Sequence, residues 1–216
     1  QTLRHFICCD APPAPVGERV LLNLPDGDRL LAVCHLPQEQ PRGCLIAVHG
    51  LNGCMDAPHI LWLTPAALAA GLVLLRVNMR GAGPARALAR KTYNAGAGAD
   101  LALFIYWAKQ RFTELPLYMM GHSLGGTAAL NMALDHPGAA GRLAGLVIVG
   151  APIDMTATAR KFHRPRNWLY LRYMLAGMKQ IVATTPHIEQ RYVDAAMRAS
   201  NIFAFDDQVT APLAGH

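Results

Sequence analysis

Between residues 44 and 149 the sequence alternates short, continuously apolar runs with longer segments of helical character. An apolar run of about four to eight residues that ends at a glycine or a polar turn is typical of a strand buried on both faces. Four runs fit this description: Cys44–Val48, Leu72–Val77, Leu117–Met120 and Leu146–Val149. Buried strands separated by helices predict a mostly parallel sheet with helices on both sides.

Helices are expected over Pro58–Ala70, Asp100–Gln110 and Leu124–Leu134. The middle segment has the clearest signal, because its apolar residues follow the i, i+3, i+4, i+7 spacing of one helix face: Leu101, Phe104, Ile105 and Ala108. Before the first apolar run, Glu18–Leu24 and Arg29–Leu36 flank a Pro-Asp-Gly-Asp turn and predict an antiparallel hairpin. The whole pattern gives six strands and no internal repeat.

The strand pattern stops after Asp154. Residues 160–191 carry seven Arg or Lys side chains, and they include a helical stripe made of Trp168, Leu171, Leu175 and Met178. We therefore predict that residues 1–154 form the α/β core and that residues 155–216 form a helical cap or lid. The basic, aromatic stretch 160–180 resembles a helix that could contact lipid headgroups, but a lid with solvated arginines is the favoured interpretation.

Composition excludes several classes of protein. A chain that is 52% hydrophobic and 16% charged is neither disordered nor a solvating polypeptide. The net charge of +6 is not concentrated in a dense basic stripe, so a nucleic-acid partner is not expected. No signal peptide is recognisable.

Five cysteines lie in the first quarter of the chain: Cys8, Cys9, Cys34, Cys44 and Cys54. An odd count without a C-x-x-C spacing argues against a zinc site and against a disulfide framework. Free thiols in a reducing, cytoplasmic location are the expected state. No pair of histidines has the spacing of a metal site, so neither a metal nor a cofactor is predicted.

The sequence Gly121-His122-Ser123-Leu124-Gly125 lies between a predicted strand and a predicted helix. This is the context in which G-x-S-x-G forms a nucleophile elbow, a strained turn that holds a serine hydroxyl above the sheet. Small neighbours two positions away on each side let the strand and the helix approach each other. Because the chain contains only Ser123 and Ser200, about 0.015 accidental matches are expected. Ser123 is the candidate nucleophile.

A nucleophile elbow also needs hydrogen-bond donors for the oxyanion that forms during acyl transfer. One donor is expected to be the backbone N–H of Leu124, which follows the nucleophile at a helix N-terminus. The other is expected to be the N–H of Leu51, in the loop after the strand that ends at His49-Gly50. We interpret His49 and His122 as residues that shape these loops, not as the general base.

Several motifs in the same order resemble those of α/β-hydrolases of the YheT-like branch, predicted esterases related to mammalian abhydrolase-domain lipases. These motifs are Gln1–Leu3, Leu24–Arg29, His49–Gly53, Asn78–Gly83, Gly121–Gly126 and Phe205–Leu213. The resemblance implies an α/β-hydrolase fold with an N-terminal hairpin and a helical cap. It also implies serine-dependent hydrolysis of small or lipid-like carboxylic esters, with Ser123 as nucleophile and Leu51 and Leu124 as oxyanion donors. Acyl transfer or thioester cleavage on the same elbow is the alternative reaction.

The same resemblance places the triad acid and histidine after the Phe205–Leu213 motif, on loops that follow two further strands. Asp206, Asp207 and His216 are therefore not assigned to a triad. The expectation is a chain truncated at both ends that lacks the last two strands and is inactive alone, since a serine without a base is a weak nucleophile. A non-catalytic binding protein is the alternative of a different class.

Overall fold

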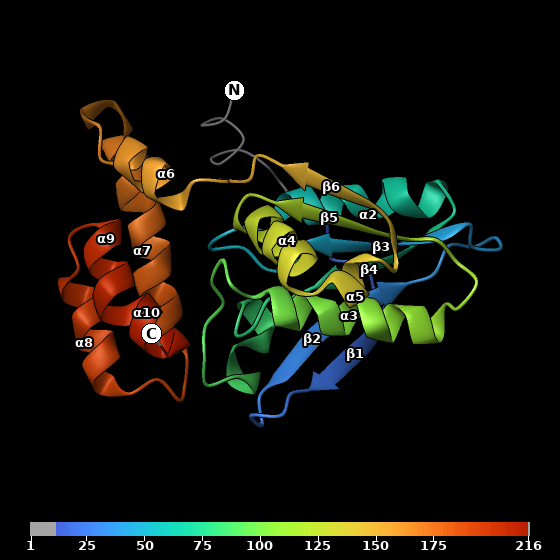
Figure 1. Cartoon of the computed structure of the whole chain (residues 1–216), viewed down its shortest axis with the longest axis horizontal. Coiled ribbons are helices and arrows are strands. Elements are labelled where there is room, and N and C mark those ends of the chain that lie inside the picture. The colour runs from blue at the N-terminus through green and yellow to red at the C-terminus, as the bar shows by residue number, and fades with distance from the viewer. Residues whose placement is uncertain (1–11, 216) are drawn as a thin grey trace.

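Six strands form one sheet at the centre of this computed structural model, which describes residues 12–215 (Figure 1). Across the sheet the strand order is β1-β2-β4-β3-β5-β6. The strands are β1 (Glu18–Asn23), β2 (Arg29–His35), β3 (Gly43–Val48), β4 (Leu72–Val77), β5 (Leu117–His122) and β6 (Leu143–Val149). The Gln1–Leu3 motif, Cys8, Cys9 and His216 lie outside the described residues.

The first two strands form the predicted antiparallel hairpin, and β2 also runs antiparallel to β4. The strands from β4 to β6 are parallel, with β3 between β4 and β5. In this register Val48 at the end of β3 lies opposite Gly121 near the end of β5. The loops that follow β3 and β5 therefore leave the sheet at the same edge, where ligand sites of parallel sheets form.

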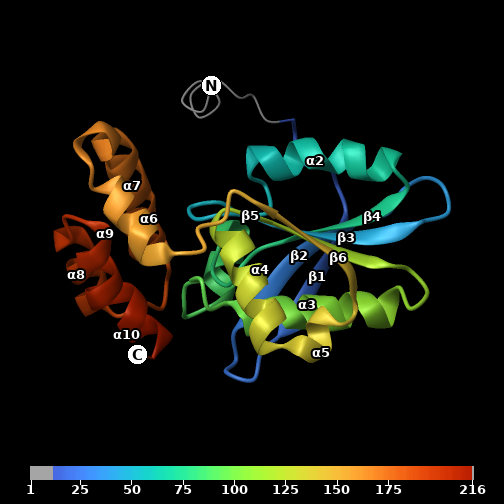
Figure 2. The same ribbon diagram turned by 45° about the horizontal axis from the view of Figure 1, so that its top comes forward.

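Helices cover both faces of the sheet (Figure 2). Helix α2 (Pro58–Ala69) lies on one face, and α3 (Gly98–Arg111), α4 (Leu124–Asp135) and α5 (Pro137–Ala140) lie on the other. A short 3-10 turn, η1 (Gly83–Leu88), follows β4. This arrangement confirms the predicted α/β layers.

Strand β3 shows why the central runs are apolar throughout. Ile46 and Val48 point into the core beneath α3 and α4, whereas Leu45 and Ala47 point into the core beneath α2. Because successive side chains of a strand face opposite sides, a strand covered on both faces needs apolar residues at every position.

Two strand boundaries differ by more than one residue from those predicted. The third apolar run is predicted to end at Met120 and the fourth to begin at Leu146, but β5 continues through His122 and β6 begins at Leu143. Gly121 remains in its strand because it has partners on both sides, Val48 and Ile148. Pairing with neighbouring strands thus overrides the local tendency of glycine to end a strand.

Strand β6 is the last strand on its side of the sheet within the described residues. Leu146 and Ile148 pack towards α4, whereas Val147 and Val149 on the other face are about half exposed. An edge of this kind presents unpaired backbone groups to any further strand.

After Asp154 the chain is helical. Asp154 caps α6 by accepting a hydrogen bond from the Ala157 N–H at 2.8 Å. The elements are α6 (Met155–Phe162), η2 (Pro165–Asn167), α7 (Trp168–Thr184), α8 (Gln190–Arg198), α9 (Ile202–Phe205), a π-helical turn η3 (Asp206–Thr210) and α10 (Ala211–Ala214). The proposed division of the chain at residue 154 stays a prediction.

The helices after Asp154 share a small core of their own, in which Leu175, Met178 and Val182 of α7 contact Phe205 and Val209. Leu175 and Met178 of the expected apolar stripe are thus buried, but Trp168 at its start is half exposed. The stripe faces the core of the cap only in its second half.

The thiols of Cys34, Cys44 and Cys54 are free. Burial raises the pKa of Cys34 to about 11 and that of Cys44 to about 12, so both are protonated at neutral pH. No helix within residues 12–215 combines the length and the apolar character that crossing a bilayer would require.

An ionic network fixes the hairpin to the rest of the core. The guanidinium of Arg80, just after β4, donates two hydrogen bonds to the Asp100 carboxylate, at 2.7 and 2.9 Å. It also donates to Asp28 at 3.1 Å and to Asp26 at 2.5 Å, in and beside the hairpin turn. Asp28 is buried and also accepts the Arg90 N–H at 3.0 Å. One arginine therefore neutralises carboxylates from two distant segments.

We expect Arg80→Ala to lower the free energy of unfolding by about 3 kcal/mol, because it leaves buried carboxylates without a counter-charge. The matched control is Arg111→Ala, since Arg111 forms a half-exposed pair with Glu18 whose loss should cost at most about 1 kcal/mol. Urea denaturation of the two variants gives the comparison. Equal losses would contradict the central role of the Arg80 network.

Candidate functional site

Ser123 lies in a strained turn between β5 and α4. Its backbone has φ 52° and ψ −123°, in a region that residues with a side chain rarely adopt. The Ser123 N–H donates to the Val149 carbonyl at 2.8 Å, which ties the turn to the end of β6. The turn thus has the shape expected of the G-x-S-x-G sequence.

The glycines around Ser123 are required by close packing of the backbone. A Cβ at Gly121 would lie 2.6 Å from the Gly125 carbonyl oxygen, and one at Gly125 would lie 2.2 Å from the His49 oxygen. A Cβ at Gly126 would lie 2.8 Å from the Ala151 Cβ. Real Cβ atoms do not approach this closely, so the spacing of the motif reflects how near α4 lies to β3 and β5.

The loop after β3 lies against the same turn. A Cβ at Gly50 would be 3.0 Å from the Ser123 Cβ, which places this loop directly beside the serine. Within residues 12–215 the backbone N–H groups of Leu51 and Leu124 donate no hydrogen bond. Ser123, Leu51 and Leu124 all line one pocket, so the structure brings the three predicted site residues together.

His49 is buried, and both of its ring nitrogens have partners. Nδ1 lies 2.8 Å from the Gly50 oxygen, and Nε2 lies 3.1 Å from the Met79 nitrogen. Because the Met79 N–H can only donate, Nε2 is the acceptor and Nδ1 carries the proton. The ring is neutral and connects the loop after β3 to the loop after β4. His49 thus shapes the site, as its position in the sequence predicts.

The His122 side chain lies against the first turn of α2. Its ring lies against that of His59, with centroids 4.3 Å apart. Burial lowers the pKa of His122, and burial together with the neighbouring His122 lowers that of His59 to about 4. Within the described residues no hydrogen bond joins a histidine to the Ser123 hydroxyl.

We expect stability to fall with acidification below neutral pH. Burial lowers the pKa of His49 to about 4, below the value of about 6.5 in the unfolded chain. Between these two values the unfolded chain binds more protons, so the free energy of unfolding decreases as pH falls. His49 alone contributes a slope of about 1.4 kcal/mol per pH unit near pH 5.

Urea denaturation at several pH values between neutrality and pH 5 measures this slope. Glutamine at position 49 offers one donor and one acceptor but does not titrate. In His49→Gln the free energy of unfolding should therefore depend less steeply on pH, by the equivalent of nearly one bound proton. An unchanged slope would contradict the conclusion that His49 is both buried and neutral in the folded protein.

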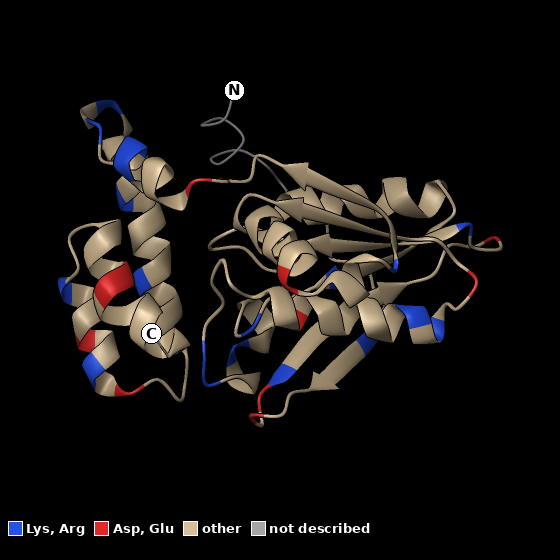
Figure 3. Cartoon of the chain, in the orientation of Figure 1, with Lys and Arg blue, Asp and Glu red and all other residues tan. Residues whose placement is uncertain are grey.

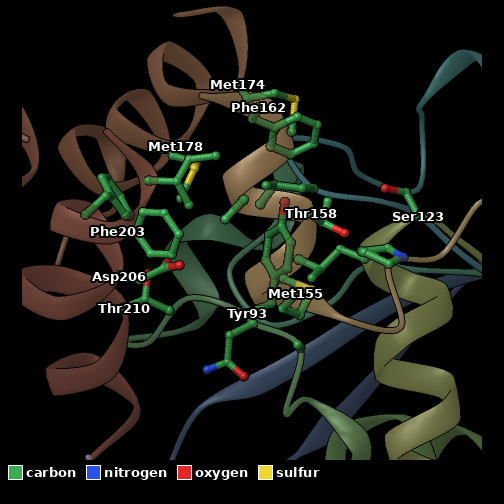
Figure 4. A pocket seen from close by; sticks show the side chains of 18 of the residues that line it. Tyr93, Ser123, Met155, Thr158, Phe162, Met174, Met178, Phe203, Asp206 and Thr210 are labelled. Atoms are coloured by element: carbon green, nitrogen blue, oxygen red, sulfur yellow. The ribbon is translucent and has the colours of Figure 1, made fainter. Parts of the chain in front are cut away.

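A pocket of about 930 Å³ opens between the sheet edge and the cap (Figure 4). Ser123 lies at one side of it, and Asp206 and Thr210 lie at the other. Its walls are mostly apolar and come largely from the cap: Met155, Phe162, Met174, Met178, Ile181, Phe203 and Phe205. The pocket therefore offers a mostly apolar volume next to the serine.

Asp206 belongs to the motif after α9 and does not approach Ser123. Its carboxylate accepts a hydrogen bond from the Thr210 hydroxyl at 2.9 Å within the π-helical turn. Burial raises its pKa, and this effect exceeds the opposing influence of Thr210. Asp206 and Ser123 lie at opposite sides of the pocket (Figure 4), and neither Asp206 nor Asp207 is assigned to a triad.

Asn52 is a site residue that sequence reasoning missed. It adopts φ 60°, and its side-chain Nδ2 donates to the Met174 carbonyl of α7 at 2.9 Å. A Cβ at Gly177, one turn further along α7, would lie 2.4 Å from that same Nδ2. The cap helix therefore rests directly on the loop that contains Leu51. The only local signal was the Asn-Gly dipeptide, which favours a left-handed turn.

We expect Gly177→Ala to destabilise the protein by about 1–3 kcal/mol, because the new methyl group displaces the Asn52 side chain. In an Asn52→Gly background the same substitution should be neutral or stabilising. Glycine tolerates the positive φ at residue 52 and leaves room for the methyl group, and alanine is the better helix former. A double-mutant cycle from urea denaturation measures the coupling. Additive effects would contradict direct contact.

Comparison with known proteins agrees with this geometry. Residues 43–184 match the family model of the alpha/beta hydrolase fold. The chain is 29% identical over 201 residues to the predicted esterase YheT of Escherichia coli (strain K12), covering 90% of this chain and 59% of that protein. It is 26% identical over 178 residues to the phospholipase ABHD3 of Mus musculus, covering 81% of this chain and 43% of that protein.

A similar solved structure is that of a soluble variant of monoglyceride lipase from Saccharomyces cerevisiae. It superimposes with a TM-score of 0.58 at 20% identity, covering 83% of this chain and 57% of that chain. The chain thus spans about half the length of the curated relatives that it matches. The family match, the sheet order and the turn at Ser123 agree, and the chain belongs to the alpha/beta hydrolase fold family.

Proposed function

We propose that this chain provides the nucleophile and the oxyanion donors of a serine-dependent carboxylic ester hydrolase. The observation that carries the proposal is the left-handed turn that holds Ser123 at the pocket, beside two backbone N–H groups without partners. This is the arrangement that acyl transfer to a serine requires.

In the proposed reaction, the Ser123 Oγ attacks the ester carbonyl carbon while a histidine base accepts the hydroxyl proton. The N–H groups of Leu51 and Leu124 stabilise the negative oxygen of the tetrahedral intermediate. Its collapse breaks the bond to the leaving alcohol, which takes the proton from the histidine, and water then hydrolyses the acyl-enzyme. The proposal assigns no base within residues 12–215.

The pocket supports esters with an apolar acyl group as the substrate class. Methionine side chains such as Met155, Met174 and Met178 adapt to flexible chains, and Phe162 and Phe203 add apolar area. The names of the relatives, which include an esterase, a phospholipase and a monoglyceride lipase, agree with this class.

A non-catalytic binding protein is the second candidate. It is favoured by the absence of a hydrogen bond from the Ser123 hydroxyl to any histidine in the described part of the chain. Such a protein would bind an apolar ligand in the same pocket without altering that ligand chemically.

The test is hydrolysis of p-nitrophenyl esters by the full-length protein, together with labelling by a fluorophosphonate probe. We expect Ser123→Ala to abolish labelling and to lower kcat/KM by at least about 10⁴-fold, as loss of a nucleophile does. Ser200→Ala is the matched control, because Ser200 is exposed and is the only other serine. Equal activity of the wild type and the Ser123→Ala variant would exclude the assignment.

A further inference from the structure

The outer side of the cap carries a cluster of cations without acidic neighbours. Residues 155–188 contain no Asp or Glu. Five basic side chains from α6, the η2 turn with the residue before it, and the first half of α7 are exposed, and none forms an ion pair within the described residues. We call this the basic cap surface: Arg160, Lys161, Arg164, Arg166 and Arg172. Figure 3 shows its charges gathered at the end of the cap around α6.

Apolar side chains are exposed within the same surface. Trp168 is 50% exposed and Leu169 is 61% exposed, both at the start of α7 and directly after the η2 turn. The Arg172 guanidinium lies over the Trp168 ring at 5.3 Å from its centroid. Large apolar residues beside unpaired cations are the composition of helices that lie at a membrane interface, where tryptophan occupies the headgroup level.

The same two helices form the wall of the pocket on their other side. Phe162 of α6 and Met174 of α7 line the pocket that contains Ser123. A surface that touches lipid on the outer side of these helices would therefore hold the pocket close to the source of acyl chains. This second observation distinguishes the basic cap surface from a merely solvated helix face.

We propose that the basic cap surface docks the protein on an anionic phospholipid bilayer, with Trp168 and Leu169 inserted among the headgroups. The five cations neutralise anionic headgroups and thereby favour binding to an anionic membrane surface. Docking is independent of the proposed hydrolysis, because it requires neither Ser123 nor a base. A failure of one proposal is thus distinguishable from a failure of the other.

Tryptophan fluorescence tests the insertion directly. The chain contains three tryptophans, so Trp62→Phe with Trp107→Phe leaves Trp168 as the only reporter. We expect its emission to shift to the blue with vesicles of phosphatidylcholine and phosphatidylserine, but not with phosphatidylcholine alone. The matched control retains only Trp62, which is 57% exposed on α2, outside the cap. An unshifted Trp168, or an equal shift of Trp62, would overturn the proposal.

Co-sedimentation with the same vesicles tests the charges. Arg164→Glu with Arg166→Glu should weaken binding to anionic vesicles at least about tenfold. Arg19→Glu with Arg29→Glu, on exposed positions of the hairpin, changes net charge equally and should have less than about a twofold effect. Equal losses in both pairs would show that net charge alone drives binding. Binding of duplex DNA that the cap pair abolishes, without any Trp168 shift on vesicles, would favour a nucleic-acid surface instead.

Discussion

The left-handed backbone of Ser123 is the constraint around which this edge of the sheet is built. Holding a residue with a side chain in that conformation costs about 1–3 kcal/mol, so the surrounding structure must fix it. Three features do so: the parallel ladder that places β5 beside β3, the close passage of α4 that only glycine allows, and the hydrogen bond from the Ser123 N–H to Val149. The turn is thus a product of the whole sheet.

Buried polar groups keep the neighbouring loops in place. His49 is neutral and uses one nitrogen as donor and the other as acceptor, which joins the loops after β3 and β4. Arg80 similarly joins the hairpin turn to the first turn of α3 through Asp28 and Asp100. His49, Asp28 and Asp100 are buried, so their partners must be present for the fold to tolerate them. These contacts connect the loops at this edge of the sheet to one another and to the hairpin.

The cap combines two surfaces of opposite character on the same helices. The inner side of α6 and α7 is apolar and encloses the pocket, whereas the outer side carries unpaired cations and an exposed Trp168. Asn52 connects the inner side to the loop beside Ser123 through its hydrogen bond to Met174. Any displacement of the cap would therefore disturb the conformation of that loop.

The sequence by itself determined the strand and helix pattern and the hairpin, and it predicted a turn at Ser123 with donors at Leu51 and Leu124. These features depend on residues close together in the chain, where hydrophobic periodicity and turn residues predict the local structure. Only the tertiary structure decided that β5 extends through Gly121, that Asn52 meets α7 and that Trp168 faces outward. These outcomes depend on packing between distant segments, such as residues 122 positions apart, which no local pattern records.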